Sequence, residues 1–502
     1  MNNSNFKKPA LWIAFIAYTL LFACAMFHHE MWGDEYHSWN IAKSSSSLGE
    51  LMTNIRYEGH PPAWYLILWT ISKFSHQLVW VQTIHLLIAV AAVFVLLFFS
   101  TIPVFTRVWF PFSYYLLFEF TTLSRNYAIG ILIACCICVI IRRQFKYQRL
   151  LYYALLILLA STHLLGILLA GSLHLYFLLL NKERGQPNKA LLLHGVAGIL
   201  LGLSALWFIF PPADSILHPQ AFLQRHWQLP AQLATILYAP LRSLMPIPAW
   251  WNHHWWNTQF LLEAQGQYPF LKIVSALCSV GLLACAFAVL RGNRKSLALF
   301  GLNVLFTFGT ATVFPLTSTR YVGFIFIGFM VAWWLYTSET PVNRRQQWLV
   351  SMLLFIQLAG AGVALQQDLK YPFSNAWAVK RMVAEVPQGQ QLVTDYWGMI
   401  AVSAFADKPT YCVNQEKVMS YLMWKKGEFM NVPGGVNPHY KGVNTFLQQQ
   451  GLRQVYMITT YSPQVLQERD SVFTQGFHSE LLDKEEGGID RYGDFYLYKI
   501  SR

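Results

Sequence analysis

Apolar runs long enough to cross a lipid bilayer recur along the chain between residues 9 and 366. A membrane-spanning helix needs about 20 predominantly apolar residues, because the hydrocarbon core is about 30 Å thick. Only 12% of the 502 residues are charged, against about 25% in an ordinary soluble domain. A soluble fold of this composition would aggregate, so the sequence predicts a polytopic α-helical membrane protein.

The first apolar run, residues 9–27, follows Lys7 and Lys8 as the core of a signal peptide would. No small-residue cleavage pattern precedes His28 and His29, so we expect this run to remain as the first span. Six of the seven cysteines lie in apolar runs, which predicts no disulfide framework.

Clusters of lysine and arginine separate the apolar runs and set the expected orientation, because such clusters stay on the cytoplasmic side. The clusters lie at residues 7–8, 142–149, 182–189, 291–295 and 344–345. With the N-terminus inside, about 11 spans fit between them, and the third ends near Ser124 after a turn near Arg107. The formal net charge of +13 is therefore a topology signal, and we expect no nucleic-acid partner.

This topology leaves three large segments on the outer face: residues 28–60, residues 211–268 and the tail from 367 to 502. The tail is richer in charge, and it places strand-like runs at 391–394 and 455–459 near a helical stretch at 376–386. We therefore expect a transmembrane domain over residues 1–366. A small α/β domain over residues 367–502 should lie outside the cytoplasm.

Two adjacent carboxylates, Asp34 and Glu35, come just after the first span. Carboxylates at a membrane boundary are unfavourable unless they are solvated or used in function. An alternative is that both residues only cap the helix that follows, since negative charge is favourable at a helix N-terminus. Glu58 and His60 precede a pair of prolines that suits the first turn of the next apolar helix. A proline-started helix explains the prolines well and the two polar residues poorly.

Two arginine and tyrosine elements are expected at the outer ends of spans: Arg125 with Tyr127, and Arg320 with Tyr321. A snorkelling role at the interface is the alternative for each arginine, although anchoring arginines favour the cytoplasmic side. An outer-face carboxylate with two arginines suits chemistry on an anionic lipid headgroup. Arginine grips phosphate through its planar fork, and a carboxylate can accept the proton of an attacking hydroxyl or amine.

In order and spacing, these residues resemble integral-membrane glycosyltransferases of the GT-C fold. The resemblance is to the family 39 type, which includes protein O-mannosyltransferases and the lipid A aminoarabinose transferase. It rests on Asp34-Glu35 after the first span, His60-Pro61-Pro62 opening the next helix, Arg125-x-Tyr127 and Arg320-Tyr321, and covers roughly residues 9–366.

The resemblance implies a multi-pass enzyme of the inner membrane that transfers a hexose or pentose from a polyprenyl-phosphate donor, inverting the anomeric carbon. The acceptor would be a lipid, a glycan or a protein. Asp34 matches the position of the family's catalytic carboxylate, and Glu35 would support it. The donor phosphate or sugar would be bound by Arg125, Tyr127, Arg320, Tyr321, Glu58 and His60.

Three questions stay open on the sequence alone. Asp34, Glu35, Glu58 and His60 could hold a divalent cation only if the fold brought them together, so the use of a divalent cation is left open and no metal site is assigned. A lipid or solute transporter or flippase is the alternative function, but transporters usually place ionisable residues near the midplane of inverted repeats, and no repeat is visible. A non-catalytic scaffold is the third hypothesis.

Overall fold

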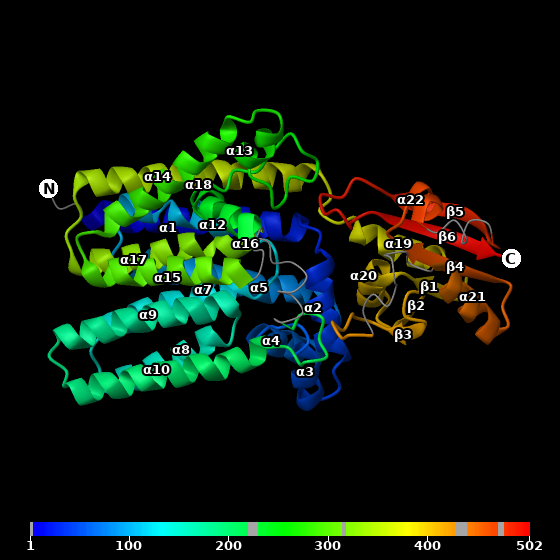
Figure 1. The fold of residues 1–502 in the computed structure, drawn as a ribbon, viewed down its shortest axis with the longest axis horizontal. Helices are drawn as coiled ribbons and strands as arrows, with labels where there is room; N and C mark the ends of the chain where they lie inside the picture. The colour runs from blue at the N-terminus through cyan, green and yellow to red at the C-terminus, as the bar shows by residue number, and fades with distance from the viewer. Residues whose placement is uncertain (1–3, 219–228, 314–317, 428–438, 470–475) are drawn as a thin grey trace.

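The computed structural model describes residues 4–218, 229–313, 318–427, 439–469 and 476–502. A bundle of long helices forms one part of the molecule, and a mixed α/β domain packs against one end of the bundle (Figure 1). Among the described residues, seven helical segments are long and apolar enough to cross a membrane. The prediction of a polytopic helical membrane protein with a C-terminal α/β domain is therefore confirmed.

The bundle contains both membrane-length helices and shorter apolar ones. Its helices are α1 (Ser4–His28), α5 (Leu78–Phe99), α7 (Tyr127–Arg142), α8 (Gln148–Ala160), α9 (Leu164–Glu183), α10 (Asn188–Ile209), α12 (Leu229–Leu244), α14 (Leu271–Leu290), α15 (Arg294–Val313), α17 (Phe324–Glu339) and α18 (Arg344–Lys370). Short helices α6 (Val104–Arg107), α13 (Phe260–Glu263) and α16 (Thr319–Val322) and the turn η3 (Ala264–Gly266) connect them.

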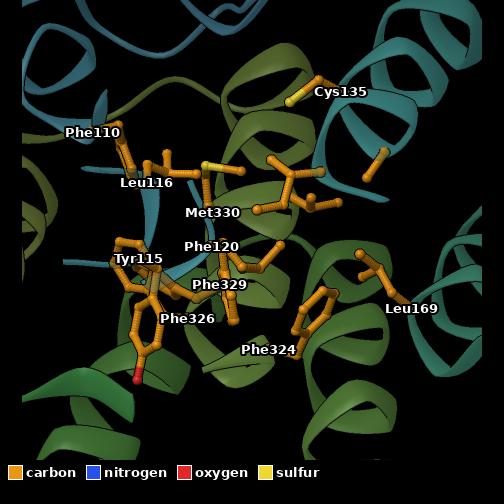
Figure 2. Packing of buried hydrophobic residues seen from close by; sticks show 14 of the residues in the cluster. Phe110, Tyr115, Leu116, Phe120, Cys135, Leu169, Phe324, Phe326, Phe329 and Met330 are labelled. Atoms are coloured by element: carbon orange, nitrogen blue, oxygen red, sulfur yellow. The ribbon is translucent and has the colours of Figure 1, made fainter. Parts of the chain in front are cut away.

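The core of the bundle is built around α17, because this helix is apolar on every side. Its residues from Phe324 to Tyr336 are all buried, as expected for a helix that has no polar face. Figure 2 shows aromatic residues of α17 packed against side chains of the 110–120 segment. By contrast, α10 exposes most of its apolar surface, which fits contact with lipid.

The expected third span, near residues 108–124, is not a continuous helix. It consists of a 3-10 turn, η1 (Phe110–Phe112), and a π-helical turn, η2 (Tyr115–Glu119). Pro111 cannot donate a backbone hydrogen bond, which breaks the helix. The hydroxyls of Thr121 and Thr122 donate to carbonyls five residues earlier. Irregular backbone is tolerated at membrane depth when it is buried and satisfied in this way.

Part of the segment expected to form the second outer loop, residues 211–268, belongs to the bundle instead. Helix α12 packs against α14, α15 and α17. The sequence did not indicate a helix here, because Pro230 and Pro240 fall within this segment and proline is unfavourable inside a helix. Residues 219–228 of this loop lie outside the described part of the chain.

Three short helices follow α1 at the end of the bundle that meets the α/β domain. They are α2 (Gly33–Ser44), α3 (Leu48–Ile55) and α4 (Ala63–Ser72). Most of α2 is buried, from Glu35 to Ala42, because it lies between α4 on one side and α20 of the α/β domain on the other. The buried side chains of α2 thus belong to a hydrophobic cluster shared by both parts of the molecule.

The α/β domain contains a six-stranded sheet in the order β3-β2-β1-β4-β6-β5. Strands β2, β1 and β4 are parallel, and the remaining pairs are antiparallel. The strands are β1 (Leu392–Thr394), β2 (Thr410–Cys412), β3 (Lys417–Met419), β4 (Gln454–Thr459), β5 (His478–Glu485) and β6 (Phe495–Ser501). The helices are α19 (Ala376–Glu385), α20 (Tyr396–Ala406), α21 (His439–Gln450) and α22 (Pro463–Arg469). Both strand-like runs and the helical stretch predicted for the tail are therefore confirmed.

A buried ionic group joins the ends of α1 and α18 to the start of α2. The ring of His29 lies 3.0 Å from an oxygen of Asp368 and 3.5 Å from one of Glu35. Burial alone would lower the pKa of His29, but these two carboxylates outweigh it and raise the pKa to about 10. His29 is therefore a cation at neutral pH and fixes the position at which α2 begins.

We predict that Asp368→Asn destabilises the protein by about 3–5 kcal/mol, because it leaves a buried cation with one partner removed. The matched control Glu486→Gln breaks an exposed pair with Lys484 and should cost about 0–1 kcal/mol. Thermal unfolding in detergent micelles measures both.

The same ionic group predicts a pH dependence of stability. Its folded pKa lies above the ordinary value of 6.5, so its contribution is complete below that pH and is lost as the pH rises towards 10. An equal loss of stability in wild type and Asp368→Asn over this range would contradict the assignment.

Candidate active site

The carboxylate of Asp34 lies at the centre of the polar cluster between the bundle and the α/β domain. Asp34 occupies the first turn of α2, and its side chain is 37% exposed. Its Oδ2 lies 3.2 Å from Nη1 of Arg320 and 3.7 Å from Nη2 of Arg125. Burial would raise the pKa of Asp34, but the charges of the two arginines outweigh it and hold the pKa below its ordinary value. Asp34 is therefore ionised at neutral pH.

Arg125 is fixed through its guanidinium, which contacts α2, and through its backbone, which contacts α5. Its Nη1 donates to the backbone oxygen of Asp34 at 2.6 Å and to Oγ of Ser38 at 2.8 Å. The backbone oxygen of Arg125 lies 2.9 Å from Nε2 of His85 on α5. Arg125 therefore holds the first turn of α2 by contacting both the backbone oxygen and the carboxylate of Asp34.

Arg320 reaches the same carboxylate from α16. Its guanidinium carbon lies 5.1 Å from the ring centre of Trp32, 5.7 Å from that of Trp256 and 5.1 Å from that of Tyr321. Cation–π contacts of this kind are favourable where water is largely excluded, and the Arg320 side chain is only 15% exposed. The guanidinium is thus held in place while one edge faces Asp34.

The structure assigns Glu35 a supporting position. Its Oε2 accepts from the backbone N–H of Trp32 at 3.0 Å, and its Oε1 accepts from that of Ser124 at 2.5 Å. The capping role considered for both carboxylates therefore applies to Glu35. Through Ser124, Glu35 also fixes the neighbouring Arg125. Tyr127 is buried in the wall behind the arginines, where its ring packs on that of Phe120.

Glu58 and His60 lie beside Asp34 on the turn that precedes α4. Gly59 between them has a φ of +63°, a backbone conformation that favours glycine. Nε2 of His37, on α2, lies 3.2 Å from Oε1 of Glu58, and Nδ1 of His60 lies 2.7 Å from the backbone oxygen of Glu58.

Burial sets the charge states of this second group. It raises the pKa of Glu58 to about 8, against the opposing charge of Arg125. Burial also lowers the pKa of His37 and that of His60 to about 4. At neutral pH the carboxyl of Glu58 is therefore protonated and donates to a neutral His37.

The α/β domain contributes to the cluster from two directions. On one side, Trp424 stacks on the ring of His37 at 6.2 Å and hydrogen-bonds the carboxyl of Glu58. The backbone of Trp424 accepts from the backbone N–H of Ile216 at 2.9 Å and from the hydroxyl of Ser215. This segment therefore joins the loop after α10 to the site.

On the other side, the loop between β5 and β6 approaches Asp34. His253 and His254 lie 2.9 and 3.0 Å from backbone oxygens of this loop, and the backbone N–H of Asp490 donates to the backbone oxygen of Phe373 at 2.8 Å. Burial and the negative charge of Asp34 raise the pKa of Asp490 to about 7. Asp490 is therefore a second carboxyl group within electrostatic range of Asp34.

The expected site residues thus meet at one place, although their roles differ. Asp34, Arg125, Arg320, Glu58 and His60 converge, whereas Glu35 and Tyr127 support them from behind. Among the described residues, no group of three or more histidines, cysteines, aspartates and glutamates is arranged to hold a metal ion.

Sequence reasoning missed His37, Trp256, Trp424 and Asp490. His37 follows Asp34 by three residues, so one helical turn places both on the same side of α2, and this spacing was a usable signal. Trp424 and Asp490 reach the site only through the tertiary fold, and no local pattern marks them.

No family model and no curated protein matches this sequence. Among solved structures, the chain is similar to the crystal structure of ArnT from Cupriavidus metallidurans bound to undecaprenyl phosphate, with a TM-score of 0.51 and 11% identity over 97% of both chains. The apo structure of ArnT has a TM-score of 0.49 at 12% identity and the same coverage. The likeness to the first structure confirms the predicted GT-C fold, and at this identity it shows the fold alone.

We predict that Glu58 shows an infrared C=O band of a protonated carboxyl group at neutral pH, which disappears as the pH rises through about 8. The Glu58→Gln variant should lack this band, since its amide imitates the protonated carboxyl without titrating. The difference spectrum between the two proteins isolates Glu58 from Asp490. An ionised Glu58 at pH 6 would contradict the hydrogen-bond direction assigned here.

Proposed function

We propose that this protein is an integral-membrane glycosyltransferase that moves a sugar from a polyprenyl-phosphate-linked donor to an acceptor, with Asp34 as the catalytic base. One observation carries the proposal: an ionised, partly exposed carboxylate lies between two guanidiniums that are themselves fixed. The fold supports it, since ArnT shares this fold and was crystallised with undecaprenyl phosphate.

The charges of the site favour a phosphate ligand. Arg125 and Arg320 carry two positive charges against the single negative charge of Asp34, so the three groups together are cationic. Guanidinium groups bind phosphate oxygens through paired N–H donors. Trp32 and Trp256 flank Arg320 and exclude water from it, which strengthens its interaction with an anion.

The proposed reaction is a single displacement at the anomeric carbon. Asp34 accepts the proton of the acceptor hydroxyl or amine as the acceptor atom bonds to that carbon. The bond from the carbon to the phosphate oxygen breaks, and its electron pair leaves with the polyprenyl phosphate. Arg125 and Arg320 stabilise the negative charge that develops there. Attack opposite to the leaving group inverts the configuration.

The orientation follows from the clusters of lysine and arginine. We propose that the site and the α/β domain lie on the extracytoplasmic side of the inner membrane, because these clusters mark the cytoplasmic ends of the spans. No nucleotide is required on that side, since the lipid phosphate is itself the leaving group. The acceptor would be a lipid, a glycan or a protein of the cell envelope.

We predict that Asp34→Asn lowers sugar transfer by about 10²- to 10⁴-fold, the usual contribution of a general base. Purified protein is incubated with radiolabelled polyprenyl-phosphate sugars and membrane extract, and label leaving the lipid is followed. Unchanged transfer in Asp34→Asn would contradict the assigned base. Movement of intact donor across liposomes with no covalent product would support a flippase instead.

A second prediction concerns Arg320. Replacing it by methionine removes a positive charge beside Asp34 and so raises the pKa of this carboxylate. The acid limb of transfer should then move to higher pH, because the base is lost once the pH falls below its pKa. Loss of one charge-stabilising donor should also lower kcat by about 100-fold.

The matched control is Arg345→Gln, an exposed arginine at the start of α18. It removes one positive charge beyond the opposite end of α17 from Arg320 and should leave the pH profile of transfer unchanged. An acid limb that stays in place in Arg320→Met would show that Arg320 does not act on Asp34.

A further inference from the structure

Glu119 is a buried carboxyl group that the proposed reaction does not use. It ends the π-helical turn η2, and only 1% of its surface is exposed. Its Oε2 accepts from the hydroxyl of Tyr114 at 2.8 Å and from the indole N–H of Trp256 at 3.2 Å. Its Oε1 is buried with no hydrogen-bond partner among the described residues. Ionisable groups at membrane depth are unfavourable unless they are used, so this residue calls for a role.

Trp256 connects Glu119 to the candidate active site. The ring of Trp256 flanks Arg320, whose guanidinium carbon lies 5.7 Å from the ring centre. Glu119 itself lies within electrostatic range of Arg320. The next residue, Asn257, is also anchored, because its side-chain oxygen accepts from the hydroxyl of Ser318 at 2.6 Å. The indole is therefore fixed at its N–H by Glu119 while its ring supports Arg320.

Arg320 needs this support most during the reaction. Among the described residues, its guanidinium makes one hydrogen bond, to Oδ2 of Asp34 at 3.2 Å, and its Nε makes none. When Asp34 accepts the proton of the acceptor, it loses its charge, and the ion pair weakens while the leaving phosphate gains charge. The flanking rings then have to keep the guanidinium in place.

The two tryptophans that flank Arg320 differ in how they are held. The indole N–H of Trp32 is buried and has no hydrogen-bond partner within the described ranges of the chain. The indole N–H of Trp256 donates to Glu119. Trp256 is therefore the ring whose orientation is set by a polar contact outside the site.

We propose that Glu119 is a positioning residue that fixes the indole of Trp256 and, through this ring, holds Arg320 against the donor phosphate as its bond to the sugar breaks. This inference rests on the proposed glycosyltransferase function and adds a residue to the same site. Glu119 exchanges no proton with the substrate in this role. It acts only as a hydrogen-bond acceptor.

The kinetics of sugar transfer test the proposal. Glu119→Leu removes the acceptor of the indole N–H and should lower kcat by about 10- to 100-fold, the usual effect of displacing a catalytic group. The KM for the donor should change by less than about threefold, because Arg320 acts on charge that develops in the transition state. Glu119→Gln keeps an acceptor oxygen and should retain kcat within about threefold of the wild type.

A double-mutant cycle with Arg320→Met separates positioning from a general loss of structure. If Glu119 acts through Arg320, Glu119→Leu should lower kcat by less than about twofold in the Arg320→Met background. Trp256→Phe removes the indole N–H from the other side and should lower kcat about as much as Glu119→Leu. Additive losses in the cycle, or a Glu119→Gln variant as slow as Glu119→Leu, would overturn the inference.

The matched control is Tyr114→Phe, which removes the other hydrogen bond to Oε2 of Glu119 and leaves that of Trp256. It should transfer sugar as the wild type does. Ultraviolet resonance Raman spectra read the indole hydrogen bond directly: Glu119→Leu should weaken one indole N–H bond, and Tyr114→Phe should not. A thermal melting curve for each variant shows that it is folded.

Binding of farnesyl phosphate to the full-length protein in detergent micelles tests the positioning without turnover. This lipid phosphate carries the charge of the leaving group, so Glu119→Leu should bind it about tenfold more weakly. Glu119→Gln and Tyr114→Phe should bind it as the wild type does. Equal binding by Glu119→Leu and the wild type would contradict the inference.

The two proposals fail separately. If transfer depends on Asp34 but neither transfer nor farnesyl phosphate binding responds to Glu119→Leu, this inference fails while the proposed function stands. If Glu119→Leu weakens the binding of farnesyl phosphate and transfer is unaffected by Asp34→Asn, the proposed function fails instead.

Discussion

The contact of Asp34 with Arg125 and Arg320 is the constraint around which the rest of the site is arranged. In the sequence, Arg125 follows Asp34 by 91 residues and Arg320 follows it by 286. Charges this close to a membrane are unfavourable unless they are paired or used. Neighbouring residues hold each of the three in place. Glu35 fixes the backbone beside Arg125, aromatic rings flank Arg320, and His29 fixes the start of the helix that carries Asp34.

Helix α2 connects the chemistry to both parts of the molecule. Its first turn carries Asp34, while Asn40 further along donates to two backbone oxygens of the α/β domain at 2.8 and 2.9 Å. The buried apolar face of α2 belongs to a core that both parts share. A disturbance of the α/β domain is therefore expected to reach the carboxylate directly, since α2 itself packs against α20 of that domain.

The sequence was informative where a residue type is rare in its surroundings. Arginines at the outer ends of spans and a carboxylate pair after the first span stand out against an apolar chain, so their convergence was predictable from sidedness. Two strands and one helix of the tail, β1, β4 and α19, were also predicted from their residue patterns. The third span was not predicted correctly, since its apolar residues have the composition of a span while Pro111 and a π-helical turn break the helix.

The different roles of Glu35 and Asp34 depend on which way each side chain points, and adjacency in sequence does not specify that. Trp424 and Asp490 lie more than 380 residues from Asp34 along the chain, and only the tertiary fold brings them near.

The central claim is that one ionised carboxylate, held between two arginines, acts as a base in a direct displacement. The stereochemistry of the product tests this most directly. A donor of known anomeric configuration is converted, and the configuration of the new glycosidic bond is read by NMR. The account predicts inversion, because the acceptor attacks opposite to the phosphate. Retention would require a covalent glycosyl intermediate on the protein and would contradict Asp34 as a base in a single displacement.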